Sequence, residues 1–289
     1  MAIIVDKETK LVVQGLTGSE GSFHGLRNKR YGTQVVAGVT PGKGGQDVEG
    51  IPVFDTMVDA VEETGANTTM VFVPARFAAD AIYEAVDAGI ATVICIAEGL
   101  PAHEMLRVYT YIRPRGVTML GPNCPGALSP DKANVGIIPA EIFTEGNIGL
   151  VSRSGTLTYQ IGHELTQMGL GNSTIVGIGG DPVVGSSFID VLERFEADAQ
   201  TEYVVMVGEI GGDEEEKAAA FIEAKMTKPV VAYIAGFEAP PGKTMGHAGA
   251  IISGSSGTAQ GKKEALEAKG IRVGTSPTEA AQFAAEIAK

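Results

Sequence analysis

The fold of this chain is decided near its N-terminus, by the stretch Leu11-Val12-Val13-Gln14-Gly15-Leu16-Thr17-Gly18-Ser19-Glu20-Gly21. A short apolar strand runs into a turn with glycine at every third position, and a helical pattern follows. Strand, glycine-rich turn and helix form the front of a nucleotide-binding βαβ unit. The spacing G-x-x-G-x-x-G differs from the dinucleotide pattern G-x-G-x-x-G, but the turn still offers N–H groups and a helix N-terminus to a phosphate. A tight turn that binds nothing is the alternative.

A lysine follows the second strand of this unit. The predicted strand 33–39 ends in the loop Thr40-Pro41-Gly42-Lys43-Gly44-Gly45. An NAD-binding enzyme usually places an acid here for the ribose hydroxyls. Lys43 instead suits a phosphorylated ribose or a pyrophosphate, so NADP and coenzyme A both fit. A solvated surface lysine is the alternative.

Apolar strands alternate with helical patterns through the first half of the chain. Further strands are predicted at residues 68–73, 92–96 and 117–120. This rhythm predicts an α/β fold with a parallel, doubly wound sheet, whose ligand lies at the carboxyl ends of the strands. Residues 125–146 hold several prolines and no long periodic run, which indicates a linker. We therefore expect one domain over residues 1–124 and a second over residues 147–289.

A second series of strand–helix units begins after the predicted linker. The strand 147–151 leads through Ser152 and Arg153 to a helix over 157–168. Ser154, Gly155 and Thr156 precede this helix, where their amides and hydroxyls and the helix dipole form an anion site. Ser154 as an ordinary N-cap is the alternative.

One histidine stands among small residues, in the stretch Lys243-Thr244-Met245-Gly246-His247-Ala248-Gly249-Ala250. Pro240, Pro241 and Gly242 precede it and prevent a helix from running through the approach. The neighbouring glycines leave no Cβ near the ring, so the imidazole can approach a phosphoryl group. Neutral histidine is a nitrogen nucleophile. A turn that happens to contain histidine is the alternative.

Several segments follow strands of the second predicted sheet and are expected to gather along one edge: 154–156, 179–181, Glu209 and His247. Glu209 can hold the imidazole tautomer through Nδ1–H and leave Nε2 as the nucleophile. The acids 213–216 open a helix, where the dipole favours them, so this run needs no binding role. The sequence contains no Walker lysine motif and no kinase signature, so it gives no sign of binding ATP itself.

Composition excludes several classes of protein. The 289 residues carry a net charge of −13 and no block of Lys or Arg, which argues against a nucleic-acid partner. Cys95 and Cys124 make neither a disulfide framework nor a metal site, and we predict no metal ligands. We find no signal peptide and no apolar run approaching the roughly 20 residues of a spanning helix. We expect a cytoplasmic protein without a membrane segment.

Nearly end to end, the chain resembles the family of succinyl-CoA synthetase α subunits. The matching motifs are 14–18 (QGLTG), 38–45 (GVTPGKGG), 121–126 (GPNCPG), 152–159 (SRSGTLTY), 177–182 (GIGGDP), 208–212 (GEIGG) and 246–250 (GHAGA). The resemblance implies an N-terminal Rossmann-like CoA-binding domain followed by a flavodoxin-like ligase domain.

The resemblance also implies roles for individual residues. His247 would be the phosphorylated residue and Glu209 its partner, and Tyr159 would lie at the carboxylate substrate. Gln160 departs from the family, in which an acid often follows the tyrosine, and leaves the identity of the acid open. The residues expected to contact coenzyme A are Thr17, Gly18, Ser19, Glu20, Lys43, Ile96, Ala97 and Glu98.

The activity that the resemblance implies is a reversible ligase reaction of the citric acid cycle. Succinyl-CoA, a nucleoside diphosphate and phosphate would exchange with succinate, CoA and a nucleoside triphosphate through phosphohistidine. An ATP-grasp β subunit would hold ATP or GTP and Mg²⁺, in an αβ or α2β2 assembly. Three alternatives stay open: a ligase for malate or another dicarboxylate, an NADP-dependent oxidoreductase, and a non-catalytic CoA-binding module. The histidine loop and the second phosphate site argue against the oxidoreductase. The presence of His247, Glu209 and Ser154 argues against the non-catalytic module.

Overall fold

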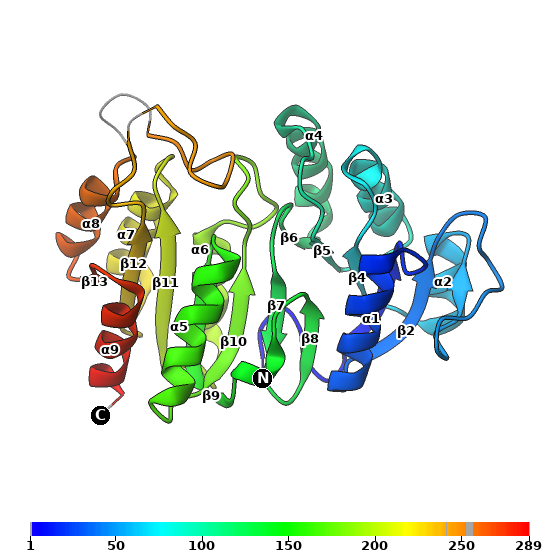
Figure 1. Cartoon of the computed structure of the whole chain (residues 1–289), viewed down its shortest axis with the longest axis horizontal. Coiled ribbons are helices and arrows are strands. Elements are labelled where there is room, and N and C mark those ends of the chain that lie inside the picture. The colour runs from blue at the N-terminus through cyan, green and yellow to red at the C-terminus, as the bar shows by residue number, and fades with distance from the viewer. Residues whose placement is uncertain (1, 241, 253–256, 289) are drawn as a thin grey trace. The chain divides into compact units, whose positions relative to one another are not determined.

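A computed structural model describes residues 2–240, 242–252 and 257–288, so Pro241 of the approach to the histidine loop lies outside the described residues. The chain divides into two compact units (Figure 1). The N-terminal unit comprises residues 4–138 with 183–185, and the C-terminal unit comprises residues 139–182 and the described residues from 186 on, with Ala2 and Ile3. The division falls within the segment predicted as a linker.

The N-terminal unit is built on a parallel sheet with the strand order β3-β2-β1-β4-β5-β6. Its strands are β1 (Lys10–Gln14), β2 (Gln34–Val39), β3 (Val53–Phe54), β4 (Thr68–Val71), β5 (Thr92–Cys95) and β6 (Thr118–Leu120). This is the Rossmann order, in which successive strands are added toward one edge of the sheet up to β3 and toward the other edge from β4 on. The strand order therefore reverses between β1 and β4. The predicted parallel sheet is confirmed, and the reversal marks the place where a ligand binds.

Helices cover both faces of this sheet, as Figure 1 shows. They are α1 (Ser19–Tyr31), α2 (Met57–Thr64), α3 (Ala75–Asp87) and α4 (Ala102–Ile112), followed by the short 3-10 helix η1 (Arg113–Arg115). Helices α2, α3 and α4 pack against one another in succession, and α1 packs against β1 and β2. The β1 residues Leu11, Val12 and Val13 are completely buried, because a strand covered on both faces needs apolar side chains on both.

The segment predicted as a linker contains regular structure. Strands β7 (Gly126–Ser129) and β8 (Ala133–Gly136) form an antiparallel hairpin, and a 3-10 helix, η2 (Ala140–Ile142), follows. Gly126 and Gly136 have positive φ, and a Cβ at either would overlap the main chain of the opposite strand. Glycine here permits a close approach of two backbones. Composition alone does not show this pairing, so the segment was predicted as an irregular linker.

The C-terminal unit is built on five parallel strands in the order β13-β12-β11-β9-β10. They are β9 (Glu145–Ser152), β10 (Asn172–Gly177), β11 (Tyr203–Glu209), β12 (Val230–Ala235) and β13 (Arg272–Gly274). Numbered from β9, this is the flavodoxin-like order 2-1-3-4-5, with its reversal between β9 and β11. The expected second doubly wound sheet is confirmed, and its ligand crevice lies where β9 and β11 end.

The helices of the C-terminal unit form two groups (Figure 1). They are α5 (Gly155–Gln167), α6 (Phe188–Ala197), α7 (Glu214–Lys225), α8 (Ala259–Glu267) and α9 (Pro277–Ile287). Helix α5 packs against α9, while α6, α7 and α8 pack in a row. None of the helices in the described ranges is long and apolar enough to cross a membrane.

Candidate active site

The imidazole of His247 is held by the carboxylate of Glu209. Nδ1 of His247 lies 2.7 Å from Oε2 of Glu209, which is the last residue of β11. The Glu209 side chain is 6% exposed and that of His247 is 25% exposed, so the acid is buried while the ring keeps access to solvent. Because Nδ1 is occupied, Nε2 is the ring nitrogen that remains for reaction.

The charges around His247 act on its pKa in both directions. The hydrogen bond that His247 donates to Glu209 raises the pKa of His247 above its ordinary value of 6.5, and partial burial opposes that shift. The charge of Glu209 adds to the increase, the Arg153 guanidinium lowers the pKa, and Asp181 raises it. A carboxylate partner therefore makes the ring a stronger base, at the cost of keeping it protonated to a higher pH.

Arg153 completes the charge arrangement, although no role was predicted for it from the sequence. It follows β9 directly, and its Nε lies 3.2 Å from Oε1 of Glu209 in an ion pair that is not aligned as a hydrogen bond. Its Nη2 donates to the carbonyl oxygen of Asp181 at 3.2 Å. Its place at the end of a central strand, next to the predicted anion site, is the signal that could have identified it.

Glycines allow the histidine loop to lie close to its neighbours. A Cβ at Gly180 would overlap the ring of His247, and a Cβ at Gly211 would overlap the carbonyl oxygen of Gly249. The N–H of Gly249 also donates to the carbonyl oxygen of Gly180 at 3.3 Å. The structure thus brings together three of the segments expected at one edge: the turn after β10, Glu209 and His247.

Ser154 is the N-cap of α5, which was the alternative to an anion-binding role. Its Oγ accepts the N–H of Leu157 at 3.3 Å. Gly155 and Thr156 then open the helix, and the first N–H groups of any helix lack partners inside it. Capping and anion binding are compatible, because the cap uses a different N–H. Tyr159 lies in the next turn of α5 and is half-buried.

The acidic run at the start of α7 is not uniform. Asp213 is largely exposed, as the helix-dipole interpretation expects, but Glu215 is completely buried. Burial raises the pKa of the Glu215 carboxyl, and the charges of Lys262 and Arg153 oppose that shift. The Lys262 ammonium, 2.5 Å away, is also completely buried. Sequence reasoning missed this pair, because its members lie 47 residues apart.

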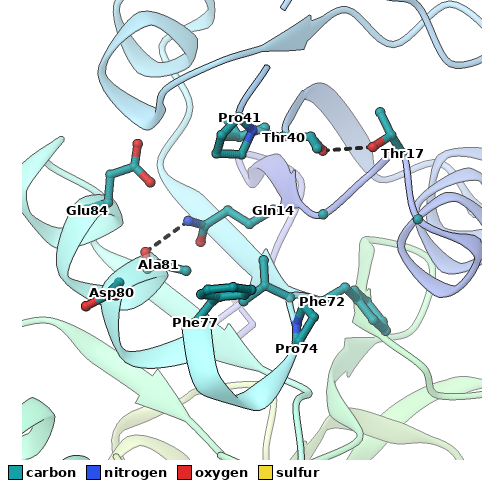
Figure 2. A pocket seen from close by; sticks show the side chains of 14 residues that line it. Gln14, Thr17, Thr40, Pro41, Phe72, Pro74, Phe77, Asp80, Ala81 and Glu84 are labelled. Atoms are coloured by element: carbon teal, nitrogen blue, oxygen red, sulfur yellow. Dashed lines mark hydrogen bonds between the residues drawn. The ribbon is translucent and has the colours of Figure 1, made fainter. Parts of the chain in front are cut away.

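In the N-terminal unit, a cavity of about 770 Å³ opens where β1, β2 and β4 end. Thr17 lies on the turn after β1, and its hydroxyl donates to that of Thr40 at 3.2 Å, the contact drawn as a dashed line in Figure 2. Gly18 lines the same cavity, and Pro41, Phe72 and Phe77 supply apolar walls. Its volume is that of a small-molecule site, which is typically about 300–1,000 Å³.

A second cavity, of about 420 Å³, shares Phe72, Val73 and Pro74 with the first. It is lined by three of the residues predicted to contact coenzyme A: Glu20, Ile96 and Ala97. Ser19, Lys43 and Glu98 are exposed and line neither cavity. Five of the eight predicted residues thus lie around the two cavities and three lie on the surface.

Metal ligands do not gather in the part of the chain that the structure describes. There, no group of three or more His, Cys, Asp or Glu side chains is arranged to hold a metal ion. Cys95 and Cys124 are buried thiols, and the Cys124 Sγ donates to the carbonyl oxygen of Cys95 at 3.3 Å.

Each half of the chain matches a known domain family. The CoA binding domain family matches residues 6–99. The CoA-ligase family matches residues 151–272. The first match covers strands β1 to β5 with their turns, and the second covers Arg153, Glu209 and His247.

Comparison with individual proteins gives matches over the full length. Subunit alpha 2 of the ADP-forming succinate–CoA ligase of Archaeoglobus fulgidus is 59% identical over 287 residues, which are 99% of this chain and 100% of that protein. The corresponding alpha subunit of Aquifex aeolicus is also 59% identical, over 100% of this chain and 95% of that protein. The solved ATP citrate lyase of Methanothrix soehngenii, in complex with citrate and coenzyme A, has the same fold, with a TM-score of 0.87 and 25% identity. This chain spans about half of that enzyme, 51% of its length.

Proposed function

Because this chain belongs to the family of succinate–CoA ligase α subunits, we propose that His247 carries the phosphoryl group in the reversible conversion of succinyl-CoA, phosphate and a nucleoside diphosphate to succinate, CoA and a nucleoside triphosphate. The observation that carries this proposal is the 2.7 Å contact between Nδ1 of His247 and the buried Glu209 carboxylate. That contact leaves Nε2 as the nucleophile.

Phosphate first attacks the thioester carbonyl of succinyl-CoA, the carbon–sulfur bond breaks, and CoA leaves as succinyl phosphate forms. Nε2 of His247 then attacks the phosphorus of succinyl phosphate. The bond between phosphorus and the acyl oxygen breaks, and succinate leaves with the electron pair as a carboxylate. The ring becomes positively charged as the N–P bond forms, and Glu209 stabilises that charge at Nδ1–H. Transfer to a nucleoside diphosphate restores the neutral imidazole. The N–H groups that open α5, at Gly155 and Thr156, offset the charge of the phosphoryl group.

The N-terminal unit fits coenzyme A. The glycine turn packs tightly against α1 and β4, since a Cβ at Gly21 would overlap the carbonyl oxygen of Gly15 and a Cβ at Gly15 would lie 2.9 Å from that of Phe72. This packing places the open N-terminus of α1 beside the cavity, where it suits a phosphate. Thr17 and Gly18 would hold the phosphates and the apolar walls the rest of the molecule, whose thiol supplies the acceptor for the succinyl group. An NADP-dependent oxidoreductase leaves His247 and Glu209 without a role.

We further propose that the partner is a β subunit of the ATP-grasp type. It would supply ATP or GTP and Mg²⁺, which agrees with the absence of a Walker or kinase motif from this sequence. The assembly would be αβ or α2β2, in the cytoplasm.

An acid screen on the complex of this chain with its β subunit tests the proposed function. CoA-dependent ADP or GDP formation from the triphosphate is measured with succinate, malate and citrate at equal concentrations. We expect succinate to be the best substrate, as the names of the two relatives suggest. A preference for malate would favour the alternative dicarboxylate ligase and direct attention to Tyr159 and Gln160. If none of the acids supports activity, the proposal is contradicted.

A further inference from the structure

A fully buried pair of opposite charges lies behind Glu209. Glu215, in the first turn of α7, and Lys262, on α8, are both 0% exposed, and Nζ of Lys262 lies 2.5 Å from Oε2 of Glu215. The desolvation cost of two buried charges cancels much of their attraction, so such a pair is weak evidence for stability alone. The mechanism proposed above uses neither residue.

The second oxygen of Glu215 binds the main chain of Glu209. Oε1 of Glu215 accepts the N–H of Glu209 at 3.1 Å. Gly208 makes room for this contact, because a Cβ there would lie 2.5 Å from Cγ of Glu215. Both oxygens of Glu215 therefore face N–H donors, the arrangement of an ionised carboxylate.

Lys262 ties the turn after β11 to the segment that follows the histidine loop. Its Nζ donates to the carbonyl oxygen of Gly212 at 3.1 Å and to Oε2 of Glu216 at 3.0 Å. The N–H of Gly211, in the same turn, donates to the carbonyl oxygen of Gly257 at 2.8 Å. Hydrogen bonds close to the buried ammonium group thus hold both the turn that follows Glu209 and the main chain at Gly257.

We propose that Glu215, supported by Lys262, is a positioning residue for the phosphohistidine site: it fixes the main chain of Glu209 so that the carboxylate stays against Nδ1 of His247. The effect of Glu215 on phosphoryl transfer rests on the proposed function. The contact between Glu209 and His247 that Glu215 maintains is part of the structure whether or not that function holds. Proximity effects explain why this matters, since a displacement of about 1 Å can cost roughly 10²-fold in rate.

Two double variants separate positioning from general packing. Glu215→Leu/Lys262→Met removes both charges and the acceptor for the Glu209 N–H, whereas Glu215→Gln/Lys262→Met removes the charges but keeps an amide oxygen as acceptor. Neither leaves one member of the buried pair charged without its partner, a change that strongly destabilises proteins. Glu214→Gln is the matched control, because Glu214 lies on the same helix and pairs at the surface with Lys217, at 2.8 Å.

Two readouts are taken on each variant: the rate at which His247 takes label from γ-labelled nucleotide in the complex with the β subunit, and the NMR titration midpoint of the His247 ring in the full chain. His247→Asn assigns the ring signal among the four histidines. The groups that act on this midpoint are Glu209, Arg153 and Asp181. CoA binding, measured by calorimetry, reports on the fold.

We expect the Leu-containing double variant to label roughly 10- to 100-fold more slowly and to titrate at a lower pH, because Glu209 no longer stabilises the protonated ring. The Gln-containing double variant and the control should stay close to the wild type in both readouts. Equal rates and equal midpoints in the two double variants would overturn the proposal. If the wild type itself takes no label, the proposed function fails, while the midpoints still decide whether Glu215 positions Glu209.

Discussion

At the scale of single residues, the site depends on one short contact in which a buried carboxylate holds a partly exposed ring. Glu209 fixes which ring nitrogen carries the proton and stabilises the positive charge that develops when Nε2 forms a bond. Arg153 pairs with the second oxygen of the same carboxylate, 3.2 Å away, and so limits its rotation. Orientation and charge stabilisation therefore come from the same carboxylate.

Replacing Glu209 by glutamine tests this double role. Glu209→Gln keeps an oxygen that can accept from Nδ1–H but removes the negative charge. We expect labelling of His247 to slow by roughly 10²- to 10⁴-fold, with unchanged CoA affinity, because the cavity proposed for coenzyme A lies in the other unit. Rapid-quench labelling and calorimetry measure the two quantities. Glu238→Gln, at an exposed site before the histidine loop, is the control, and a wild-type labelling rate in Glu209→Gln would exclude Glu209 as the partner.

The pH dependence of labelling follows from the direction of the pKa shift. The Glu209 hydrogen bond raises the pKa of His247 above 6.5, and only the neutral ring can attack phosphorus. The labelling rate should therefore fall on acidification with a midpoint above 6.5. In Glu209→Gln the midpoint should move to lower pH. A profile with the same midpoint in both proteins would mean that Glu209 does not act on the ring.

Residues were predictable where a local pattern carried the signal. His247 and Glu209 stand out because each comes after a strand predicted from the sequence and has glycines close to it. Arg153, Glu215 and Lys262 were not predicted to act, because their importance comes from contacts between distant segments. A lysine in a helix or a glutamate in its first turn ordinarily lies on the surface.

At the scale of elements, the turns that follow parallel strands bring the chemistry together. Each unit places a short loop at its reversal of strand order: the glycine turn after β1 in one, and the turn from β9 into α5 in the other. Alternating strands and helices made these turns predictable. The hairpin of β7 and β8 was not predictable in the same way, because its strands are only four residues each and rich in small residues.

The turn after β10 makes a steric prediction. Gly180 does not have a positive φ, so alanine suits its backbone, but a Cβ there would overlap the His247 ring. Gly180→Ala should displace the ring and slow labelling by roughly 10- to 100-fold. Its unfolding temperature should stay near that of the wild type, because the histidine loop can move outward. Wild-type labelling in a normally folded Gly180→Ala protein would show that the loop does not need this close approach.

The loop after β2 makes an electrostatic prediction. Lys43 is exposed and lines neither cavity, so its contribution to CoA binding should be that of a surface charge on a phosphate. Lys43→Ala should weaken CoA binding by roughly 2- to 5-fold, and the difference should shrink at high salt. Calorimetry with CoA and with NADPH measures this, with Lys7→Ala as a surface control. Tight NADPH binding without CoA binding would contradict the assignment of this unit.

At the scale of the whole molecule, two doubly wound units divide the work of the proposed reaction. The N-terminal unit has the Rossmann strand order and the cavities suited to coenzyme A, and the C-terminal unit has the flavodoxin-like order and the histidine. The alternation of strands and helices predicted both sheets, but it could not give the strand order, because order depends on which strands pair across the chain. The point of division, after Ile138, likewise depends on packing.

The most direct test of the account is the phosphorylation of His247 itself. The complex of this chain with its β subunit is incubated with γ-labelled ATP or GTP and Mg²⁺, and the label on this chain is followed after acid and after base. We predict label that is lost in acid and kept in base, that is discharged by succinate with CoA, and that is absent from His247→Asn. Label that persists in His247→Asn, or a wild-type complex that forms succinyl-CoA without ever carrying label on this chain, would contradict the account.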